Sequence, residues 1–245
     1  MGLRSPEIVA DAKPGQFVMI RVGSGIEPLL RRPFSICGRQ GNDVFLVLYR
    51  VVGKGTAIMA ETEKGGRLSV LGPLGNGFEL PKPGQTVVLV AGGIGVAPLF
   101  SLAQAVKEKD IQFMAGFGSS DEIIRMDPIN DLNGINISFS TDDGTKGHAG
   151  LVTDLLDEYL KKNRDRSDSM SLFICGPLPM LKRVAAMALD HNISCHASLE
   201  SAMACGLGAC QGCAVRSSSQ EKTEFYHVCK DGPVFPIGTI DWNSL

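Results

Sequence analysis

Two kinds of hydrophobic pattern divide the chain near residue 84. Between Pro14 and Leu80, short apolar segments alternate with turns rich in glycine and proline. This pattern predicts β-strands at 16–22, 34–38, 44–51 and 67–71, interrupted by a short helix at 56–61. Short strands with frequent turns are typical of a small antiparallel β-barrel. The turn Pro81-Lys-Pro-Gly-Gln85 ends this region and leads into a different pattern.

After residue 85, fully apolar runs alternate with amphipathic segments. The runs predict strands at 86–91, 111–117, 135–140, 171–175 and 194–199, and the amphipathic segments predict helices at 98–109, 151–162 and 177–190. Residues 121–132 predict an irregular, partly helical link, and 161–168 predict a solvated helix end and loop. Strands that alternate with helices in this way predict a doubly wound, mainly parallel sheet.

The composition indicates how many domains to expect and argues against nucleic acid and membranes as partners. The 245 residues, 44% of them hydrophobic, can form more than one core, and we expect a β-barrel over 1–83, an α/β domain over 84–195 and a small domain over 196–245. The net charge of −2 argues against a global basic surface for nucleic acid or anionic lipid. The apolar runs are far shorter than the ~20 residues of a membrane span, so we expect a soluble protein.

Four of the seven cysteines follow the order C-x4-C-x2-C-x15-C: Cys205, Cys210, Cys213 and Cys229. This is the spacing of a plant-type 2Fe–2S cluster. Intervening glycines would let backbone N–H groups approach the sulfurs. Zinc is the alternative, but structural zinc sites usually arrange their ligands as two close pairs, so the spacing favours iron and sulfide. Because seven is an odd number and no signal-peptide pattern opens the chain, we expect a reducing compartment, the cytoplasm, rather than disulfides.

Segments of the barrel region carry features of diphosphate binding. In the run Arg31-Arg32-Pro33-Phe34-Ser35-Ile36, a guanidinium stands next to a strand, and arginine can grip a diphosphate through two parallel N–H contacts. An Arg-Arg pair alone is usually surface charge. The functional interpretation of this pair is supported by Leu48-Tyr49-Arg50 and Gly53-Lys54-Gly55-Thr56, which add an aromatic face, a second cation and a glycine turn.

Two segments of the α/β region carry features of dinucleotide binding. The first strand runs into Gly92-Gly93-Ile94-Gly95-Val96-Ala97-Pro98, a turn in which glycines let a pyrophosphate approach the backbone. Because the match to G-x-G-x-x-G is imperfect, a purely structural turn is the alternative. A later strand ends in Cys175-Gly176-Pro177, at the sheet edge where α/β proteins bind ligands. A buried cysteine with no further role is the alternative there.

These motifs, in this order, resemble the flavin reductase superfamily typified by ferredoxin-NADP reductase. More narrowly, they resemble the electron-transfer subunits of dihydroorotate dehydrogenase B. That family carries Arg-Pro-x-Ser, Leu-Tyr-Arg, Leu-Gly-Pro-Leu-Gly-Asn-Gly-Phe, Gly-Gly-Ile-Gly-Val-Ala-Pro-Leu and Glu-Ser-x-Met-Ala-Cys-Gly-x-Gly-Ala-Cys, which are present here at 32–35, 48–50, 71–78, 92–99 and 200–210. The resemblance covers nearly the whole chain and implies an oxidoreductase subunit.

The resemblance assigns three cofactors to positions in this sequence. It assigns FAD to Arg32, Pro33, Phe34, Ser35, Leu48, Tyr49, Arg50, Gly55 and Thr56. It assigns NAD to Gly93, Ile94, Gly95, Val96, Ala97, Pro98, Cys175, Gly176 and Pro177, and the cluster to the four cysteines named above. No catalytic residue is assigned, because the cofactors carry the chemistry. Relatives also have an N-terminal segment that forms the first barrel strand, so the resemblance implies that this strand is missing here.

The function implied by the resemblance is a relay in pyrimidine biosynthesis. An FMN-containing partner subunit would oxidise dihydroorotate to orotate and pass single electrons to the cluster; FAD would collect two and deliver hydride to NAD+. A heterotetramer with two copies of each subunit is expected. The carboxylates of Asp121 and Glu122 indicate NAD rather than NADP, although Arg125 leaves NADP open. The alternatives are a flavin and iron–sulfur subunit of an NAD(P)H-dependent ferredoxin or sulfide reductase, and a zinc-stabilised nucleotide-binding regulator without redox activity.

Overall fold

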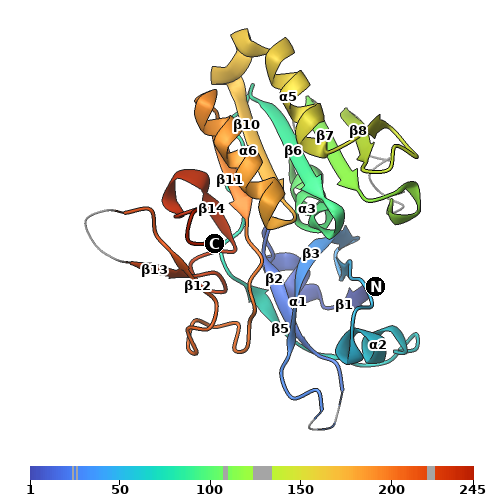
Figure 1. Cartoon of the computed structure of the whole chain (residues 1–245). Coiled ribbons are helices and arrows are strands. Elements are labelled where there is room, and N and C mark those ends of the chain that lie inside the picture. The colour runs from blue at the N-terminus through green and yellow to red at the C-terminus, as the bar shows by residue number, and fades with distance from the viewer. Residues whose placement is uncertain (24, 26, 107–109, 124–133, 220–223) are drawn as a thin grey trace.

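The fold consists of two main sheets and a small hairpin. The computed structural model describes all residues except 24, 26, 107–109, 124–133 and 220–223. Its sheets have five, seven and two strands. Figure 1 shows the five-stranded sheet below the seven-stranded sheet, with the hairpin projecting to one side. Among the described residues, no helix combines the length and the apolar character that a membrane crossing requires.

The five-stranded sheet is antiparallel and curled, in the order β1-β4-β3-β2-β5. Its strands are β1 (Gly2–Arg4), β2 (Phe17–Arg21), β3 (Arg32–Gln40), β4 (Val44–Val47) and β5 (Ser69–Leu74), with helices α1 (Pro6–Asp11) and α2 (Lys54–Ala60) beside them. Within the described residues, β1 and β5 pair with one strand each, so the sheet forms a half-barrel. The predicted antiparallel β architecture is therefore confirmed, as an open sheet.

Strand β2 separates two cores because its side chains alternate between the faces of the half-barrel. Val18 and Ile20 pack in the interior of the half-barrel. Phe17 and Met19 belong instead to a core shared with helix α6 and the C-terminal region. All four side chains are buried, and this burial on both faces explains the continuous apolar run in the sequence.

The seven-stranded sheet has the order β14-β11-β10-β6-β7-β8-β9. Its strands are β6 (Thr86–Gly92), β7 (Ile111–Phe117), β8 (Ile135–Thr141), β9 (His148–Ala149), β10 (Met170–Cys175), β11 (Ser194–Ser198) and β14 (Val234–Pro236). All neighbouring pairs are parallel except β11 with β14. Helix α3 (Val96–Ala105) packs in one core, and α5 (Val152–Lys162) and α6 (Leu178–Asp190) pack in another. The predicted doubly wound, mainly parallel sheet is confirmed.

The C-terminal region shares its core with this sheet. A hairpin of β12 (Ala214–Arg216) and β13 (Phe225–His227) follows the cysteine loop, and β14 then pairs with β11. Val228, Phe235 and Ile240 are buried in the same core as helices α5 and α6. The cysteine region is therefore held against the α/β part of the molecule by apolar packing.

The short elements are those that the sequence pattern did not predict. No element was expected before Pro14, yet Ser5 begins helix α1 by accepting the backbone N–H of Ile8 at 3.5 Å, and Pro6 follows at the first helical position. The charged run at 161–168, expected to be a solvated helix end and loop, contains the end of α5 at Lys162, and a 3-10 helix over Arg164–Ser169 follows it. Of the irregular link at 121–132, only the 3-10 turn Ser120–Glu122 and residue 123 are described; the rest lies outside the described residues.

Candidate functional site

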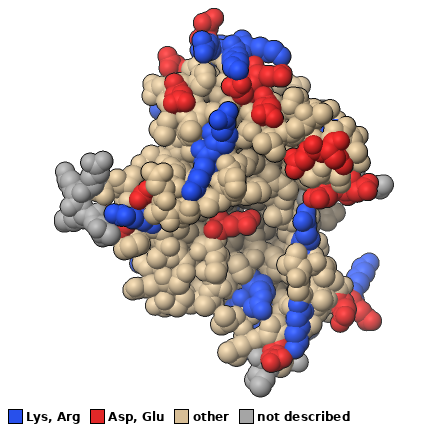
Figure 2. All heavy atoms as spheres, viewed as in Figure 1, with Lys and Arg blue, Asp and Glu red and all other residues tan. Residues whose placement is uncertain are grey.

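A cavity of about 1270 Å³ lies between the half-barrel and the carboxyl edge of the parallel sheet. It is lined by residues of both sheets and by the segment that leads from β11 to the cysteine loop. Figure 2 shows basic and acidic side chains distributed around the hollowed face of the molecule. The cavity is large enough for an extended nucleotide cofactor, because typical ligand pockets measure about 300–1,000 Å³.

The half-barrel contributes the wall that the sequence assigned to FAD. The lining residues are Arg32, Pro33, Phe34, Ser35, Leu48, Tyr49, Arg50, Val52 and Thr56. Gly55 lies behind them, and a Cβ atom at this position would stand 3.2 Å from Nε of Arg32, so glycine leaves room for the guanidinium. Arg31 instead stabilises the sheet, because its guanidinium donates to the carbonyl of Ser69 at 2.6 Å and to that of Met19 at 3.3 Å.

The parallel sheet contributes the wall that the sequence assigned to NAD. The predicted residues that line the cavity are Gly93, Ile94, Ala97, Pro98, Cys175, Gly176 and Pro177. Gly95 and Val96 are buried behind this surface. A Cβ atom at Gly95 would overlap the carbonyl of Cys175, because adjacent strands β6 and β10 end side by side. The two glycine-containing turns therefore meet at one point of the sheet edge.

The Cys175 thiol is a neutral group at this edge. It is 3% exposed, and burial, with the nearby Glu200 carboxylate, raises its pKa from 9.0 to about 12. Ser198, its partner in the parallel register, is within hydrogen-bonding reach of the thiol. Cys175 can therefore make close contact with a ligand ring without presenting a charge.

Several charged residues that sequence reasoning did not assign also line the cavity: Asp142, Asp154, Arg183 and Glu200. Burial raises the pKa of Glu200, which lies two residues after the end of β11 at Ser198. Its place after a strand at the ligand-binding edge was a usable signal, whereas Arg183 is brought in by the orientation of α6. Glu122, predicted near the adenosine end of NAD, forms an ion pair with Arg50 of the opposite wall at 3.1 Å.

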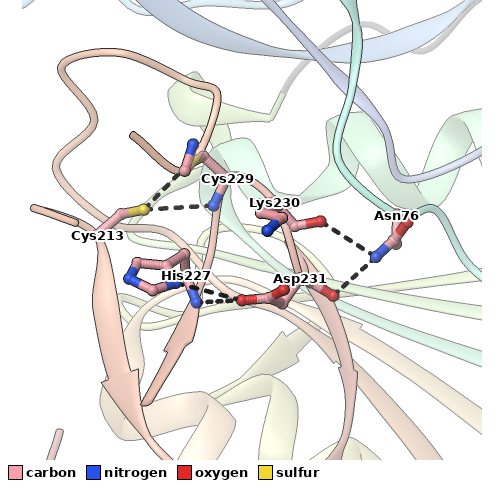
Figure 3. Close-up of polar contacts among 7 residues, drawn as sticks. Asn76, Cys213, His227, Cys229, Lys230 and Asp231 are labelled. Carbon is pink, nitrogen blue, oxygen red and sulfur yellow. Dashed lines mark hydrogen bonds and ion pairs between the residues drawn. The ribbon is translucent and has the colours of Figure 1, made fainter. Parts of the chain in front are cut away.

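The four predicted ligand cysteines lie together in the C-terminal region. Cys213 and Cys229 are buried with their sulfurs 3.3 Å apart, and the Cys210 thiol is within hydrogen-bonding reach of the Cys205 sulfur (Figure 3 shows the buried pair). No three or more His, Cys, Asp or Glu side chains of the described ranges are grouped so that they could hold a metal ion. The sulfurs therefore form two pairs, Cys205 with Cys210 and Cys213 with Cys229.

Backbone N–H groups point at these sulfurs. The N–H groups of Leu207 and Cys210 donate to Sγ of Cys205 at 3.4 Å each, and Gly208 donates to Sγ of Cys229 at 3.1 Å. The bond from Leu207, followed by that from Cys210, lowers the pKa of Cys205 to about 6, whereas burial raises the pKa of Cys229 to about 12. N–H donors of this kind stabilise negative charge on sulfur, as thiolate ligands of an iron–sulfur cluster require.

A flavin-type half-barrel and a nucleotide-binding parallel sheet enclose one cavity, and the loop with the thiol pairs follows the lining residue Met203. This arrangement defines the ferredoxin reductase class of oxidoreductases, here with an added iron–sulfur region. Family models agree with this assignment. Residues 89–186 match an oxidoreductase NAD-binding domain, and residues 200–241 match the iron–sulfur cluster binding domain of dihydroorotate dehydrogenase B.

Relatives that match nearly the whole chain identify the family within this class. The electron transfer subunit of dihydroorotate dehydrogenase B (NAD(+)) from Desulforamulus reducens is 37% identical over 99% of this chain and 92% of its own length. The corresponding subunit from Bacillus mycoides is 41% identical over 93% of this chain and 86% of its own. The chain belongs to this family of electron transfer subunits.

Solved structures share the fold. A chain of an NADH-dependent reduced ferredoxin-NADP oxidoreductase is 32% identical, with a TM-score of 0.84, and the match covers 100% of this chain and 85% of that chain. The ferredoxin reductase of carbazole 1,9a-dioxygenase, at 22% identity and a TM-score of 0.62 over 75% of this chain and 58% of its own, shows the fold alone.

Proposed function

We propose that this chain is the electron-transfer subunit of an NAD-dependent dihydroorotate dehydrogenase B, with FAD, a 2Fe–2S cluster and NAD as its cofactors. One observation supports this function above others: a single cavity joins the flavin-type and nicotinamide-type walls and is also lined by Leu199, Glu200, Ser201 and Met203, which precede the cysteine loop in the chain. When bound, the cluster carries single electrons and the flavin couples them to two-electron exchange with NAD. The protein supplies binding and orientation.

On the half-barrel side, the residues act as a cradle for FAD. The half-buried Arg32 offers its guanidinium to the diphosphate, and Phe34 and Tyr49, with ring centroids 5.9 Å apart, supply an aromatic surface. Thr56 is held at the start of α2, where its Oγ1 accepts the N–H groups of Val52 at 3.0 Å and Gly53 at 3.2 Å. Leu48, Ser35 and Pro33 complete this wall of the proposed FAD site.

On the sheet side, the glycine turn from Gly93 to Pro98 leaves backbone room for the NAD pyrophosphate, and Cys175 with Gly176 and Pro177 shapes the nicotinamide pocket. Carboxylates of Glu122, Asp142 and Asp154 line the same cavity. Of these, Glu122 follows β7, at a position where a protein that binds the additional phosphate of NADP would present arginine, and this supports NAD as the acceptor.

The partner is proposed to be an FMN-containing catalytic subunit that oxidises dihydroorotate, in a heterotetramer with two copies of each subunit in the cytoplasm. The domain boundaries proposed from the sequence, at 83/84 and 195/196, assign one cofactor to each unit. The whole-chain relatives favour this partner over a ferredoxin or sulfide reductase. One solved structure with the same fold is named as a ferredoxin-NADP oxidoreductase, but it is less similar in sequence, at 32% identity, than these relatives.

Reconstitution tests the proposal. The chain is purified without air, assayed for iron, sulfide and flavin, and mixed with a dihydroorotate-oxidising FMN subunit. We expect dihydroorotate-dependent reduction of NAD+ by the mixture and by neither subunit alone, with little reduction of NADP+. A protein that carries flavin and cluster but reduces NAD+ only with reduced ferredoxin would refute the dihydroorotate assignment, and a colourless protein would refute the relay.

A further inference from the structure

The motif Leu-Gly-Pro-Leu-Gly-Asn-Gly-Phe at 71–78 contributes no residue to the cavity, yet it contacts the cluster region. It begins within β5 and continues into the turn that carries Asn76. The side-chain amide of Asn76 donates to the carbonyl of Lys230 at 3.2 Å and to that of Asp231 at 3.0 Å (Figure 3). One asparagine of the half-barrel therefore holds two consecutive carbonyls directly after the fourth cysteine.

Backbone contacts at the same position strengthen this attachment. The N–H of Asn76 donates to the carbonyl of Gly232, and Asn76 forms an isolated parallel bridge with Pro233. On the other side, the backbone N–H of Cys229 donates to Sγ of Cys213 at 3.4 Å, so the held segment continues directly into the buried thiol pair. Three consecutive carbonyls of the Cys229 segment are thus bonded to one residue of the half-barrel.

The half-barrel also contacts the beginning of the cysteine loop. A Cβ atom at Gly206 would stand 2.6 Å from Cγ of Met19 and 3.4 Å from Cδ1 of Leu74, so the loop lies directly on β2 and β5. Strand β2 pairs with β3, which begins at Arg32 in the proposed FAD site. Paired strands β3, β2 and β5 therefore connect the FAD wall to the contacts at Gly206 and Asn76, near both ends of the cysteine set.

We propose that Asn76 is a positioning residue that fixes the Cys229 segment to the half-barrel and so sets the separation and orientation of cluster and flavin. This inference rests on the proposed function, because it requires both cofactors. Electron transfer between two centres slows steeply as their separation grows. A segment that can move away from the half-barrel would therefore lengthen the path, even if all four thiolates stayed bound.

The test compares Asn76→Ala and Asn76→Asp with the control Gln16→Ala in the full, anaerobically purified holoprotein. Gln16 donates its side-chain amide to the carbonyl of Gly75 at 2.7 Å, so this control removes a bond from the same turn without touching the cluster segment. Asn76→Asp keeps the size of the side chain but replaces the donor by a carboxylate that faces two carbonyls. Losing two neutral hydrogen bonds corresponds to an about 5-fold to 150-fold larger open population of the segment.

We expect faster hydrogen exchange of residues 228–233 in both Asn76 variants, altered g values of the reduced cluster and slower reduction of the flavin after photoreduction of the cluster. Gln16→Ala should leave all three readings near wild type. Loss of iron from both Asn76 variants but not from the control would also support the proposal. Wild-type exchange, g values and flavin reduction in Asn76→Ala would overturn it, even if Asn76→Asp fails to fold. None of these readings uses dihydroorotate or NAD, so a wrong partner assignment would not affect them.

Discussion

Replacing Arg32 tests whether the half-barrel wall binds the FAD diphosphate. Arg32 lines the cavity with a half-buried side chain, and its Nη1 donates to the carbonyl of Leu30 at 2.7 Å, which orients the guanidinium. A hydrogen bond to a charged group contributes about 1.5–3 kcal/mol. Loss of one such bond in Arg32→Ala should raise the Kd for FAD about 10-fold to 150-fold. The Kd of Arg32→Lys should lie between those of the wild type and Arg32→Ala, because lysine keeps the charge but cannot bind two phosphate oxygens in parallel.

The neighbouring Arg31 provides a matched control. It carries the same charge one position earlier, but its guanidinium bonds to the carbonyl of Ser69 at 2.6 Å and to the Ser69 hydroxyl at 2.9 Å. Arg31→Ala should therefore lower the free energy of unfolding by about 1–3 kcal/mol while leaving FAD affinity near wild type.

The assay is the quenching of FAD fluorescence on deflavinated full-length protein, beside urea unfolding of each variant. An Arg32→Ala protein that binds FAD within about twofold of wild type would refute the role of this arginine, since even one charge-assisted bond exceeds that change. A loss of FAD in Arg31→Ala equal to that in Arg32→Ala, at unchanged stability, would show that net charge rather than the placement of Arg32 controls binding.

Three further predictions follow from the site. Cys229→Ser should retain flavin but lose most iron and acid-labile sulfide, measured by chemical analysis of anaerobic protein; full iron content would contradict the ligand assignment. Gly95→Ala should abolish NAD binding and lower the urea midpoint, because its Cβ would overlap the Cys175 carbonyl, whereas Gly238→Ala, with no atom within 4 Å of the added Cβ, should change neither. Burial raises the pKa of Cys37 to about 11 and of Cys175 to about 12, from 9.0, so the folded state keeps protons that the unfolded chain releases. Their contribution to stability is complete below pH 9 and falls as pH rises toward 12; urea titrations of Cys37→Ala and Cys175→Ala should show a smaller fall than wild type.

The long periodic elements were predictable because periodicity reports burial directly. The apolar run Ile111–Phe117 is the strand β7 with the predicted bounds, and the amphipathic run that ends at Asp190 is helix α6. The three-residue strands β1, β12, β13 and β14 were not predictable, because so few positions cannot establish an alternation. Strand β14 in particular exists because β11 offers it an edge, which is information from tertiary structure.

The candidate site was predictable where neighbouring residues of one short segment form part of it. Glycine turns after strands and closely spaced cysteines are local features, so Gly93 and Cys205 could be proposed as site residues from sequence, and Gly93 does line the cavity. Arg183 could not, because its place at the cavity depends on how α6 packs against α5. The ion pair between Arg50 and Glu122 joins positions 72 residues apart, and no local pattern encodes such a distance.

The spacing of the cysteines itself has a structural explanation. The first three predicted ligands share one loop, in which the backbone N–H groups of residues 207, 208 and 210 donate to sulfurs, so their separations are limited by the loop geometry. The fourth predicted ligand, Cys229, follows the hairpin β12–β13, in which Ala214 pairs with His227, and the N–H of Val228 donates to the carbonyl of Cys213 at 3.0 Å. This pairing, together with the hold of Asn76 on the far side, determines where Cys229 lies.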